Sequence, residues 1–597
     1  MKRRVLYLVK FYLLTVLIFM AAKWAFMLCN HTEGSFSVGD MFAVLWHGLT
    51  LDLSSALYFL ALPFLVVIAG IWLNLPRWLM KPYYVIIAIA FALAFVADTS
   101  MYPFWHFKLE PSWLQYLESP KEVVANVSVW YLIVRALALL ILAILLFFAY
   151  DKIAGMPSIK RGNWKEFVLY IAMIPLMVIG IRGGVGDATT NIGQAYYSQN
   201  QFLNHSAVNP IFNFFYSISH QLEDFSQYQF FEPEECEELL ADIYTTESQD
   251  NDTLLTTSRP DILIILLEGA GEEFAHAMPY MQQLKKEGVN FSQCYANSWR
   301  TDRGTVSTLS GYPSFPTVSV MKMPEKSCLI PSIANRLKAE GYQTSFLYGG
   351  DANFTNMRSY LLSTGWNQLT DVKGFSFEDQ RTGEWGVRDD ITFKTLLKQM
   401  TKPDQKGHHL WGYSTLSSHE PWEVPLKEND DEVLNAFIYL DHCIKDFVES
   451  LRKTPEWKNL LIIMTADHGI NYQQIDNATP LQKNHIPMVW IGGAVRKPVT
   501  VQKLCNQSDL AATLLGQMGM THNDFLFSRD VTSSSYIHPI VVNNYSNAQW
   551  ICDSTGHSLY DFDMERLLIN ESKDAQQQLR LNKAIIQQTT TDLQNRK

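Results

Sequence analysis

Five apolar stretches within about the first 185 residues of this 597-residue chain are each long enough to cross a lipid bilayer. They fall at about 5–29, 55–73, 83–104, 129–149 and 166–182. The first follows a basic N-terminus but has no small-residue cleavage site, and four more come after it, so we interpret it as an anchor and not as a signal peptide. Residues 1–184 are therefore predicted to form a transmembrane domain of about five helices.

The charges in the loops between these stretches predict which side of the membrane each loop faces. Lysine and arginine are concentrated in alternate loops, namely 1–4, 77–81 and 152–165. The positive-inside rule assigns such loops to the cytoplasm. An odd number of spans then carries everything after about residue 185 to the other side, so the large second part of the chain is predicted to lie outside the cytoplasm.

Three charged residues, Asp52, Asp98 and Arg135, lie near the predicted outer ends of spans. Charges at such depths have two common explanations, a transport pathway or side chains that reach out to the membrane surface. We favour the second, because each residue lies near a span end.

The rest of the chain has the charge density of a soluble protein. Residues 185–258 are interpreted as a connector, with an aromatic segment over 207–225 and a polar linker over 247–258. A soluble domain is predicted over 259–540, completed by strands and a polar helical tail in 541–597. The formal net charge of −11, with no basic stripe, argues against a nucleic-acid partner.

A carboxylate and an imidazole stand side by side at the end of one apolar run in this soluble domain. Leu460 to Met464 is long enough for a buried parallel strand and too short for a helix, and Asp467-His468-Gly469 follows it. Open α/β sheets bind ligands outside the carboxyl ends of their strands. The pair is therefore a candidate half of a metal site. The alternative is a turn that contains a histidine by chance.

A second buried-strand pattern, DILIILLE over 261–268, also ends in a carboxylate, Glu268. The glycines at 269 and 271 could suggest a dinucleotide-binding loop. Phe274 occupies the third glycine position, so that motif is absent. Glu268 thus lies at the carboxyl end of a strand, as Asp467 does at another.

The third informative stretch is SWRTDRGTVSTLSG, over 298–311. Thr301 lies between Arg300 and Arg303, and a helix is predicted after Gly304. A hydroxyl that attacks a phosphate diester needs cations for the equatorial oxygens, and a helix N-terminus adds backbone N–H groups. The alternative is a helix-capping threonine flanked by surface arginines.

Taken in order, the strand ending in Glu268, Thr301 ahead of a helix, and Asp467-His468-Gly469 resemble the alkaline phosphatase superfamily. Within it, the chain is similar to the lipoteichoic acid synthase and phosphoglycerol transferase family over nearly its whole length. The resemblance implies an α/β sulfatase-like domain with a central, mostly parallel sheet. It also implies one divalent ion, Mn²⁺ in most of the family, with Mg²⁺ or Zn²⁺ as alternatives. The residues that match the family's ligands are Glu268, Thr301, Asp467 and His468.

The resemblance extends to residues on the substrate side, which are Asp351, Asn353, Asn356, Arg358, His419 and His485. The chain also departs from related patterns. It lacks the C/S-x-P-S-R motif of sulfatases, and Thr415 stands where two-metal members have an aspartate, so we expect one metal. The substrate loop lacks a tryptophan that some members have, which leaves the transferred group open.

The reaction predicted from these features is displacement at a phosphate diester. A metal-activated Thr301 would form a covalent phospho-threonine and pass a phosphoglycerol-type group to a glycan or glycerol-phosphate acceptor. The spans favour a phospholipid donor in the bacterial cytoplasmic membrane. Phosphoethanolamine transfer and hydrolysis of a phosphodiester or sulfate ester are the alternative reactions. Outside enzymes, the alternative is a transporter, or a membrane sensor with an inactive sulfatase-like domain.

Seven cysteines leave at least one thiol unpaired, and six of them lie in the outer part. Cys294 and Cys328 bracket the Thr301 segment and are candidates for a disulfide, although their spacing alone does not show one.

Overall fold

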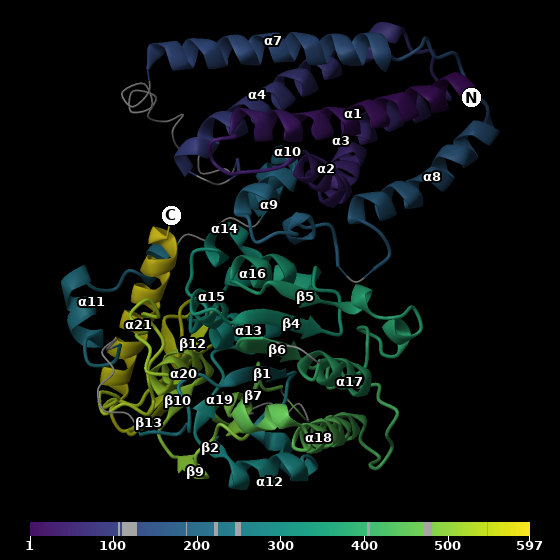
Figure 1. Ribbon diagram of the computed structural model, residues 1–597. Coiled ribbons are helices and arrows are strands. Elements are labelled where there is room, and N and C mark those ends of the chain that lie inside the picture. The colour runs from purple at the N-terminus through teal and green to yellow at the C-terminus, as the bar shows by residue number, and fades with distance from the viewer. Residues whose placement is uncertain are drawn as a thin grey trace. The chain divides into compact units, whose positions relative to one another are not determined.

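The computed structural model divides into two compact units, Met1–Gln221 and Leu222–Lys597, which are described separately (Figure 1). The described residues are 1–105, 108–109, 128–186, 188–219, 225–244, 252–402, 406–470, 472, 480–545 and 547–596. Residues 247–251 of the predicted polar linker lie outside these ranges.

The first unit is helical, and five of its helices are long and apolar enough to cross a membrane. These are α1 (Lys2–Cys29), α3 (Leu49–Ala69), α4 (Lys81–Trp105), α7 (Val129–Ile153) and α8 (Trp164–Arg182). The shorter helices are α2 (Val38–His47), α9 (Gln201–Ala207) and α10 (Pro210–Ser219). Five apolar helices were predicted in this part of the chain, and five are found among its described residues. The largest shift is in the second, which begins at Leu49 and not near residue 55.

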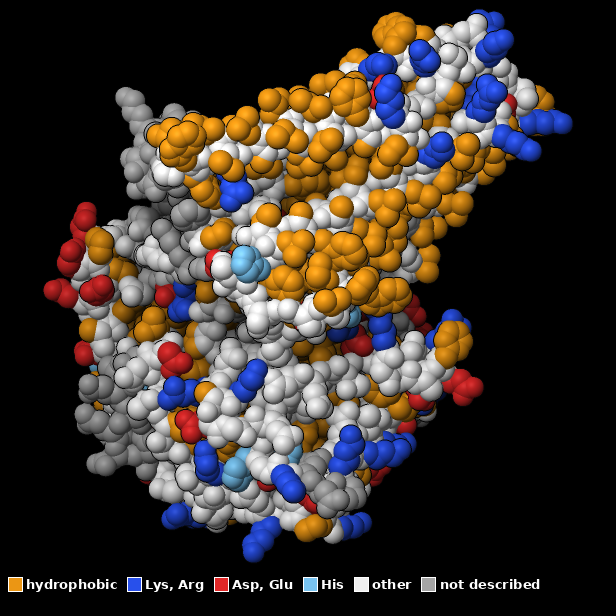
Figure 2. All heavy atoms as spheres, turned by 45° about the horizontal axis from the view of Figure 1, so that its top comes forward, with side chains coloured by type: hydrophobic (Ala, Val, Ile, Leu, Met, Phe, Trp, Pro, Cys, Tyr) orange, Lys and Arg blue, Asp and Glu red, His pale blue; other side chains and the backbone are white. Residues whose placement is uncertain are grey.

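The three basic loops of the first unit meet at one end of its helices. Arg4 forms an ion pair with Glu166 at 2.5 Å, and Lys81 forms one with Asp151 at 3.2 Å. An antiparallel bridge joins Leu75 to Ile159. Lysine and arginine side chains gather at that end in Figure 2, while hydrophobic side chains cover the helices beyond it. The common end is what the positive-inside interpretation requires of these loops.

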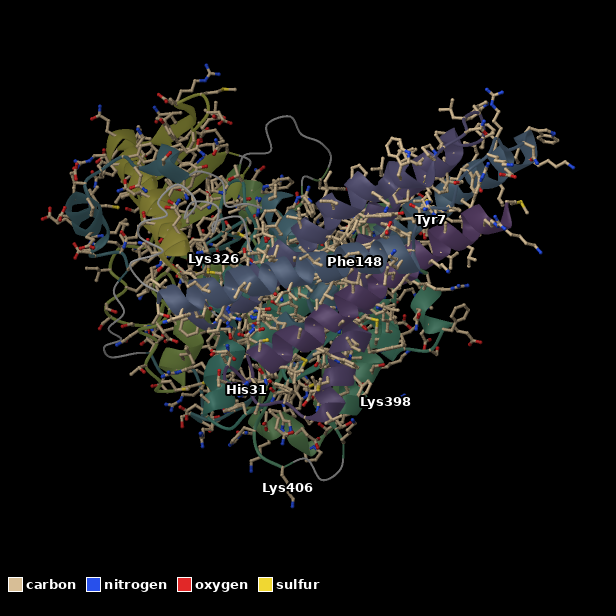
Figure 3. All side chains as sticks on the ribbon, turned by 90° about the horizontal axis from the view of Figure 1, so that it is seen from above. Tyr7, His31, Phe148, Lys326, Lys398 and Lys406 are labelled. Carbon is tan, nitrogen blue, oxygen red and sulfur yellow. The ribbon has the colours of Figure 1, made fainter. Side chains whose placement is uncertain are left out.

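The outer face of α7 is apolar along its length. Residues one helical turn apart are exposed to between 50% and 60%, namely Leu137, Ile141, Leu145 and Phe148. Figure 3 labels Phe148 on this helix, and Tyr7 and His31 near the two ends of α1. Apolar side chains exposed in such a row are typical of a lipid-facing helix surface.

Two of the charged residues in the spans are buried and do not reach for the membrane surface. Asp52 forms an ion pair with Lys23 at 2.7 Å and accepts a hydrogen bond from Asn209 Nδ2 at 3.2 Å. Asp98 pairs with Lys108. Our expectation that these carboxylates reach the surface is wrong, because each has a buried cation as its partner and needs no water.

The second unit is built on an eight-stranded sheet with the strand order β5-β4-β6-β1-β7-β8-β2-β9. Its strands are β1 (Asp261–Leu267), β2 (Val289–Phe291), β4 (Gln343–Tyr348), β5 (Gln368–Thr370), β6 (His409–Ser414), β7 (Leu460–Ala466), β8 (Met488–Ile491) and β9 (Val499–Val501). β8 is antiparallel to both β7 and β2, and the remaining pairs are parallel. This confirms the predicted α/β domain with a mostly parallel sheet.

Helices and a second sheet complete this unit. The helices are α11 (Pro233–Leu240), α12 (Pro279–Glu287), α13 (Thr301–Ser310), α14 (Pro324–Ser327), α15 (Ile333–Ala339), α16 (Met357–Ser363), α17 (Asp389–Met400), α18 (Glu432–Leu451), α19 (Pro480–Asn484), α20 (Leu510–Gln517) and α21 (Ala575–Asn595). An antiparallel sheet contains β11 (Val541–Tyr545), β12 (Ala548–Asp553), β13 (Gly556–Asp561) and β14 (Arg566–Ser572). The C-terminal helix α21 packs on this sheet and on α11, with Ile585 and Ile586 buried.

The two central strands carry the core. Every residue from Ile262 to Leu267 in β1 is fully buried, and β7 is buried from end to end. Each such leucine or isoleucine contributes about 1.5–3 kcal/mol by leaving water. The apolar runs therefore fix where both strands end, and with that the positions of Glu268 and Asp467.

Candidate metal centre

The two carboxylates meet because their strands are neighbours in register. β1 and β7 run parallel, with Leu267 opposite Ala466. The next residue on each strand is Glu268 and Asp467, so both side chains lie at the carboxyl edge of the sheet. They come from positions about 200 residues apart and are buried, with 5% of Glu268 and 0% of Asp467 exposed.

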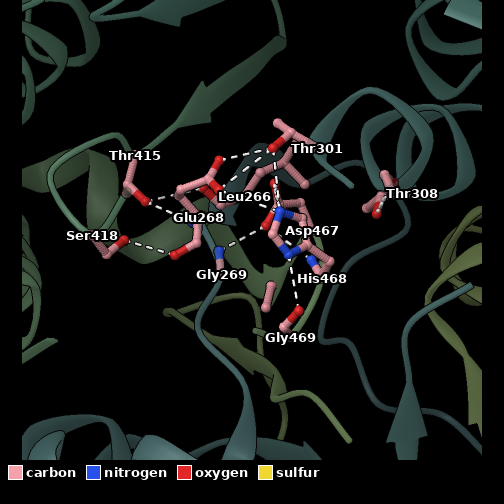
Figure 4. A network of polar contacts seen from close by, with 12 residues as sticks. Leu266, Glu268, Gly269, Thr301, Thr308, Thr415, Ser418, Asp467, His468 and Gly469 are labelled. Atoms are coloured by element: carbon pink, nitrogen blue, oxygen red, sulfur yellow. Dashed lines mark hydrogen bonds and ion pairs between the residues drawn. The ribbon is translucent and has the colours of Figure 1, made fainter. Parts of the chain in front are cut away.

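Thr301 reaches this edge as the first residue of α13. Its Oγ1 donates to Glu268 Oε2 at 3.1 Å and lies 3.3 Å from His468 Nε2 (Figure 4). The helix can approach so closely because residue 304 is glycine. A Cβ there would lie 1.9 Å from the carbonyl oxygen of Asp467. Gly304 therefore allows the hydroxyl to reach the carboxylates.

The hydrogen bonds of Asp467 and His468 leave one ligand atom of each facing the cluster. Asp467 Oδ1 accepts from the backbone N–H groups of Gly269 at 3.0 Å and His468 at 2.9 Å. Its Oδ2 is buried and accepts no hydrogen bond from any described residue. His468 Nδ1 lies 3.1 Å from the carbonyl of Gly469, so a proton on Nδ1 is held there and Nε2 is the ring nitrogen that can bind a cation.

The charges of the cluster also favour a cation. Burial raises the pKa of Asp467 to about 7, and repulsion by Glu268 adds to this. Burial lowers the pKa of His468, but the two carboxylates outweigh it and raise that pKa to about 9. The cluster thus attracts positive charge between its carboxylates. Glu268, Asp467 and His468 each offer one ligand atom, and these three atoms lie within 4.8 Å of one another. Two carboxylate oxygens and an imidazole nitrogen at this spacing fit a divalent metal ion.

Thr415 and Ser418 hold Glu268 in place, a role that the sequence did not indicate for either. Thr415 Oγ1 accepts from the Glu268 N–H at 2.9 Å, and Ser418 Oγ donates to the Glu268 carbonyl at 2.7 Å. Thr415 thus binds backbone where two-metal relatives would place an aspartate. The loop is itself held by the buried Asp389, which accepts from the N–H groups of Leu416 and Ser417, both at 3.0 Å.

A further missed residue, Gln507, joins the helix of Thr301 to the strand of Asp467. Its amide donates to Thr308 Oγ1 and to the Asp467 carbonyl, both at 2.9 Å, and accepts from the N–H of Asn297 at 2.8 Å. No pattern in the chain could have shown that this side chain turns inward.

Most of the predicted substrate-side residues have protein partners. Arg358 forms an ion pair with Asp371 and donates to Asn353 Oδ1, while Asn353 donates to Asp351. Arg300 is exposed and lies over the Trp299 ring. Arg303 donates a hydrogen bond to the Pro316 carbonyl, and Asn356 donates one to the Lys322 carbonyl. Their roles toward substrate stay predictions.

The two predicted substrate histidines lie in different surroundings. His419 packs on Trp385, with ring centroids 4.7 Å apart, and both line a small pocket beside the Thr415–Ser418 loop. It follows Ser418, whose hydroxyl binds the Glu268 carbonyl. His485 instead stacks on Tyr295, and its Nε2 contacts the Ser292 carbonyl at 3.0 Å.

A family model described as Sulfatase matches residues 260–520, which contain the whole cluster. This stretch is therefore similar to the Sulfatase family. Phosphoglycerol transferase I of Xanthomonas campestris pv. campestris (strain B100) is 26% identical over 270 residues, covering 40% of this chain and 37% of that protein. The lipoteichoic acid synthase-like YvgJ of Bacillus subtilis (strain 168) is 22% identical over 298 residues, covering 45% of this chain and 48% of YvgJ. The matches thus span less than half the length of either relative.

Solved structures share the fold of a large part of this chain. A protein in the alkaline phosphatase superfamily from Vibrio parahaemolyticus has a TM-score of 0.54 and 23% identity, covering 62% of this chain and 97% of that one. The lipoteichoic acid synthase LtaP from Listeria monocytogenes has a TM-score of 0.50 and 17% identity, covering 61% of this chain and 98% of that one. The predicted resemblance to this superfamily is confirmed.

Proposed function

We propose that this protein is a membrane-anchored, metal-dependent transferase that moves a phosphoglycerol-type head group from a membrane phospholipid to a glycan or polyol acceptor. The observation that carries the proposal is the Thr301 hydroxyl, held against Glu268 and His468 beside the unpaired oxygen of Asp467. The names of the Xanthomonas and Bacillus relatives support the transferred group. The five apolar helices support a lipid donor.

In the first step, Thr301 Oγ attacks the phosphorus of the donor. The Oγ–P bond forms as the bond from phosphorus to the diacylglycerol oxygen breaks, which gives a phospho-threonine, and the leaving oxygen takes up the proton that Thr301 gives up to form diacylglycerol. Glu268 Oε2 accepts the hydrogen bond of this hydroxyl and is placed to receive its proton. A divalent cation held by Glu268, Asp467 and His468, with Mn²⁺ our first choice, would lower the pKa of the hydroxyl and polarise the phosphoryl oxygen.

In the second step, the acceptor decides the outcome. A hydroxyl of a glycan or of glycerol phosphate attacks the phospho-threonine, and Thr301 leaves with its proton restored. Water in the same place would give hydrolysis. Arg300, exposed beside Thr301 on the Trp299 ring, is available to bind a phosphate oxygen in either step.

One observation favours a second head group. The pocket beside His419 is lined by Trp385, by the carboxylates Glu384 and Glu423, and by Arg388. An aromatic ring with carboxylates in the same pocket suits an ammonium group. Phosphoethanolamine transfer is therefore the alternative, and one experiment separates the two.

In the test, the full-length protein is placed in vesicles in the presence of Mn²⁺. The vesicles contain phosphatidylglycerol and phosphatidylethanolamine, and the head groups of the two lipids carry different labels. We expect loss of labelled phosphatidylglycerol with release of diacylglycerol, abolished by a chelator. Consumption of phosphatidylethanolamine alone would select the alternative head group. Chelator-sensitive release of free head group without any acceptor product would show a hydrolase.

The proposed reaction requires the domain to lie outside the cytoplasm. A reporter fused after residue 200 is expected to be active only outside, and one inserted in the 151–165 loop only inside. The reason is the concentration of basic residues in alternate loops, which meet at one end of the helices. Measuring alkaline phosphatase and fluorescent-protein fusions at both points checks this, and the reverse pattern would contradict it.

His419→Ala is expected to lower turnover about 10- to 1,000-fold while metal content stays near that of the wild type. His419 lines the pocket with Trp385 and is not among the clustered ligand atoms. The matched control is His442→Ala, an exposed histidine on α18, which should change neither quantity. Loss of the metal in His419→Ala would make this residue a ligand.

A further inference from the structure

Two cysteines face each other beside the metal centre. β3 (Cys294–Tyr295) pairs in parallel with β10 (Cys505–Asn506), and Cys294 lies directly opposite Cys505. Both are fully buried. Cys328, the partner suggested by the sequence, lies elsewhere and donates to the carbonyl of Glu325. The pairing of β3 with a strand about 210 residues later could not be read from cysteine spacing.

The geometry of this pair suits a disulfide bond. Neighbouring strands are about 4.8 Å apart, and disulfides join Cα atoms about 4.4–6.8 Å apart. Directly opposed residues of a parallel pair point to the same face of the sheet. Both cysteines are free thiols in the structure. Burial and the neighbouring Cys505 thiol raise the pKa of Cys294, so neither catalysis nor metal binding by a thiolate accounts for the pair.

The other described cysteines have no such arrangement. Cys552 is opposite Val541 and His557 in its sheet, while Cys443 and Cys236 lie on helices. Cys29 ends α1 in the first unit. The pairing therefore singles out one bond among the seven cysteines.

The pair lies just before two segments that build the centre. Three residues after Cys294, the N–H of Asn297 donates to the side chain of Gln507, which itself follows Cys505 by two residues. Gln507 in turn binds Thr308 of the Thr301 helix and the Asp467 carbonyl. A covalent bond between the two strands would hold both segments in register.

We infer that Cys294 and Cys505 form a disulfide bond that fastens the segment leading to Thr301 to the segment of Gln507. The inference rests on the proposed location of the domain outside the cytoplasm, where disulfides persist. The two thiols lose two protons and two electrons as the S–S bond forms. A protein disulfide oxidant of that compartment takes them up, and its own disulfide becomes a dithiol.

Mass spectrometry of the full-length protein tests the bond. Membranes are denatured in an alkylating agent without reductant, and the protein is digested. We expect a linked pair of peptides containing Cys294 and Cys505 that separates on reduction, with Cys328 and Cys443 alkylated from the start. Alkylation of both Cys294 and Cys505 before reduction overturns the inference. Lipid turnover is measured in the same preparation, so free thiols in an active enzyme would refute the disulfide and leave the proposed transferase intact.

Thermal unfolding gives a second readout. Reductant should lower the melting temperature of the wild type by roughly 5 °C, because the bond closes a long loop in the unfolded chain. Cys505→Ser should start from the lower value and respond to reductant no further. Cys328→Ser is the matched control and should behave as the wild type. An equal melting temperature of the wild type with and without reductant overturns the inference.

Discussion

Replacing Thr301 by alanine is expected to lower lipid turnover by about four to six orders of magnitude. Thr301 Oγ1 is the hydroxyl that lies within 3.4 Å of both Glu268 carboxylate oxygens and of His468 Nε2. Removing it removes the proposed point of covalent attachment. The three clustered ligand groups remain, so the variant should still bind metal, with reduced affinity.

The helix of Thr301 offers a matched control. Thr305, one turn later, is fully buried, and its hydroxyl has no hydrogen-bond partner among the described residues. Thr305→Ala should therefore lower turnover by less than about tenfold. Thr308 is a poorer control because its hydroxyl binds Gln507. Thr301→Ser keeps a hydroxyl at the same position and should keep measurable activity.

A labelled donor lipid allows the covalent intermediate itself to be detected, in addition to the loss of turnover. The wild-type protein is quenched in acid during turnover, digested and searched for a phosphorylated head group on the peptide that contains Thr301. The label should be absent from Thr301→Ala and present in Thr305→Ala. Near-normal turnover in Thr301→Ala would refute the covalent mechanism, and direct attack by an activated water would become the better account.

The ends of the two central strands could be predicted from the sequence, whereas their pairing could not. Leu460 to Met464 and Ile262 to Leu267 are continuous apolar runs, which only a strand covered on both faces accommodates at that length. Which strands pair in the sheet depends on contacts between segments about 200 residues apart in the sequence. Local sequence patterns carry no information about such contacts. The resemblance to a known family brought Glu268, Thr301 and Asp467 together before the geometry did.

Residues that position the candidate metal ligands through hydrogen bonds could not be predicted, for a physical reason. Ser418 and Gln507 act through hydrogen bonds to segments that are distant in the sequence, and serine and glutamine are common in loops and helix starts. Nothing in their spacing separates them from surface residues. The buried ion pair of Asp52 and Lys23 was also missed, because the two residues come from different helices. Such contacts depend on tertiary packing.

Asp467→Asn is expected to lower the divalent metal affinity of the full-length protein more than about 100-fold and to abolish nearly all turnover. Asparagine matches the aspartate in size and can still accept the N–H bonds of Gly269 and His468 through one oxygen. What it loses is the charge and the Oδ2 atom, which accepts no hydrogen bond from a described residue and lies 3.7 Å from His468 Nε2. The change therefore tests the ligand and leaves the fold in place. Metal content is measured after dialysis against a defined free Mn²⁺ concentration.

Asp441→Asn is the matched control for this substitution. Asp441 is also a buried carboxylate that accepts two backbone N–H bonds, from Tyr280 and Met281, but it lies on α18 outside the cluster. Its replacement should cost about 1–3 kcal/mol of stability and leave metal content and turnover per folded molecule unchanged.

A membrane sensor with an inactive domain has no need of a bound ion, so a wild type free of metal would favour that class of protein. Full metal occupancy in Asp467→Asn would place the ion elsewhere, and the Thr301 mechanism would lose its activating group.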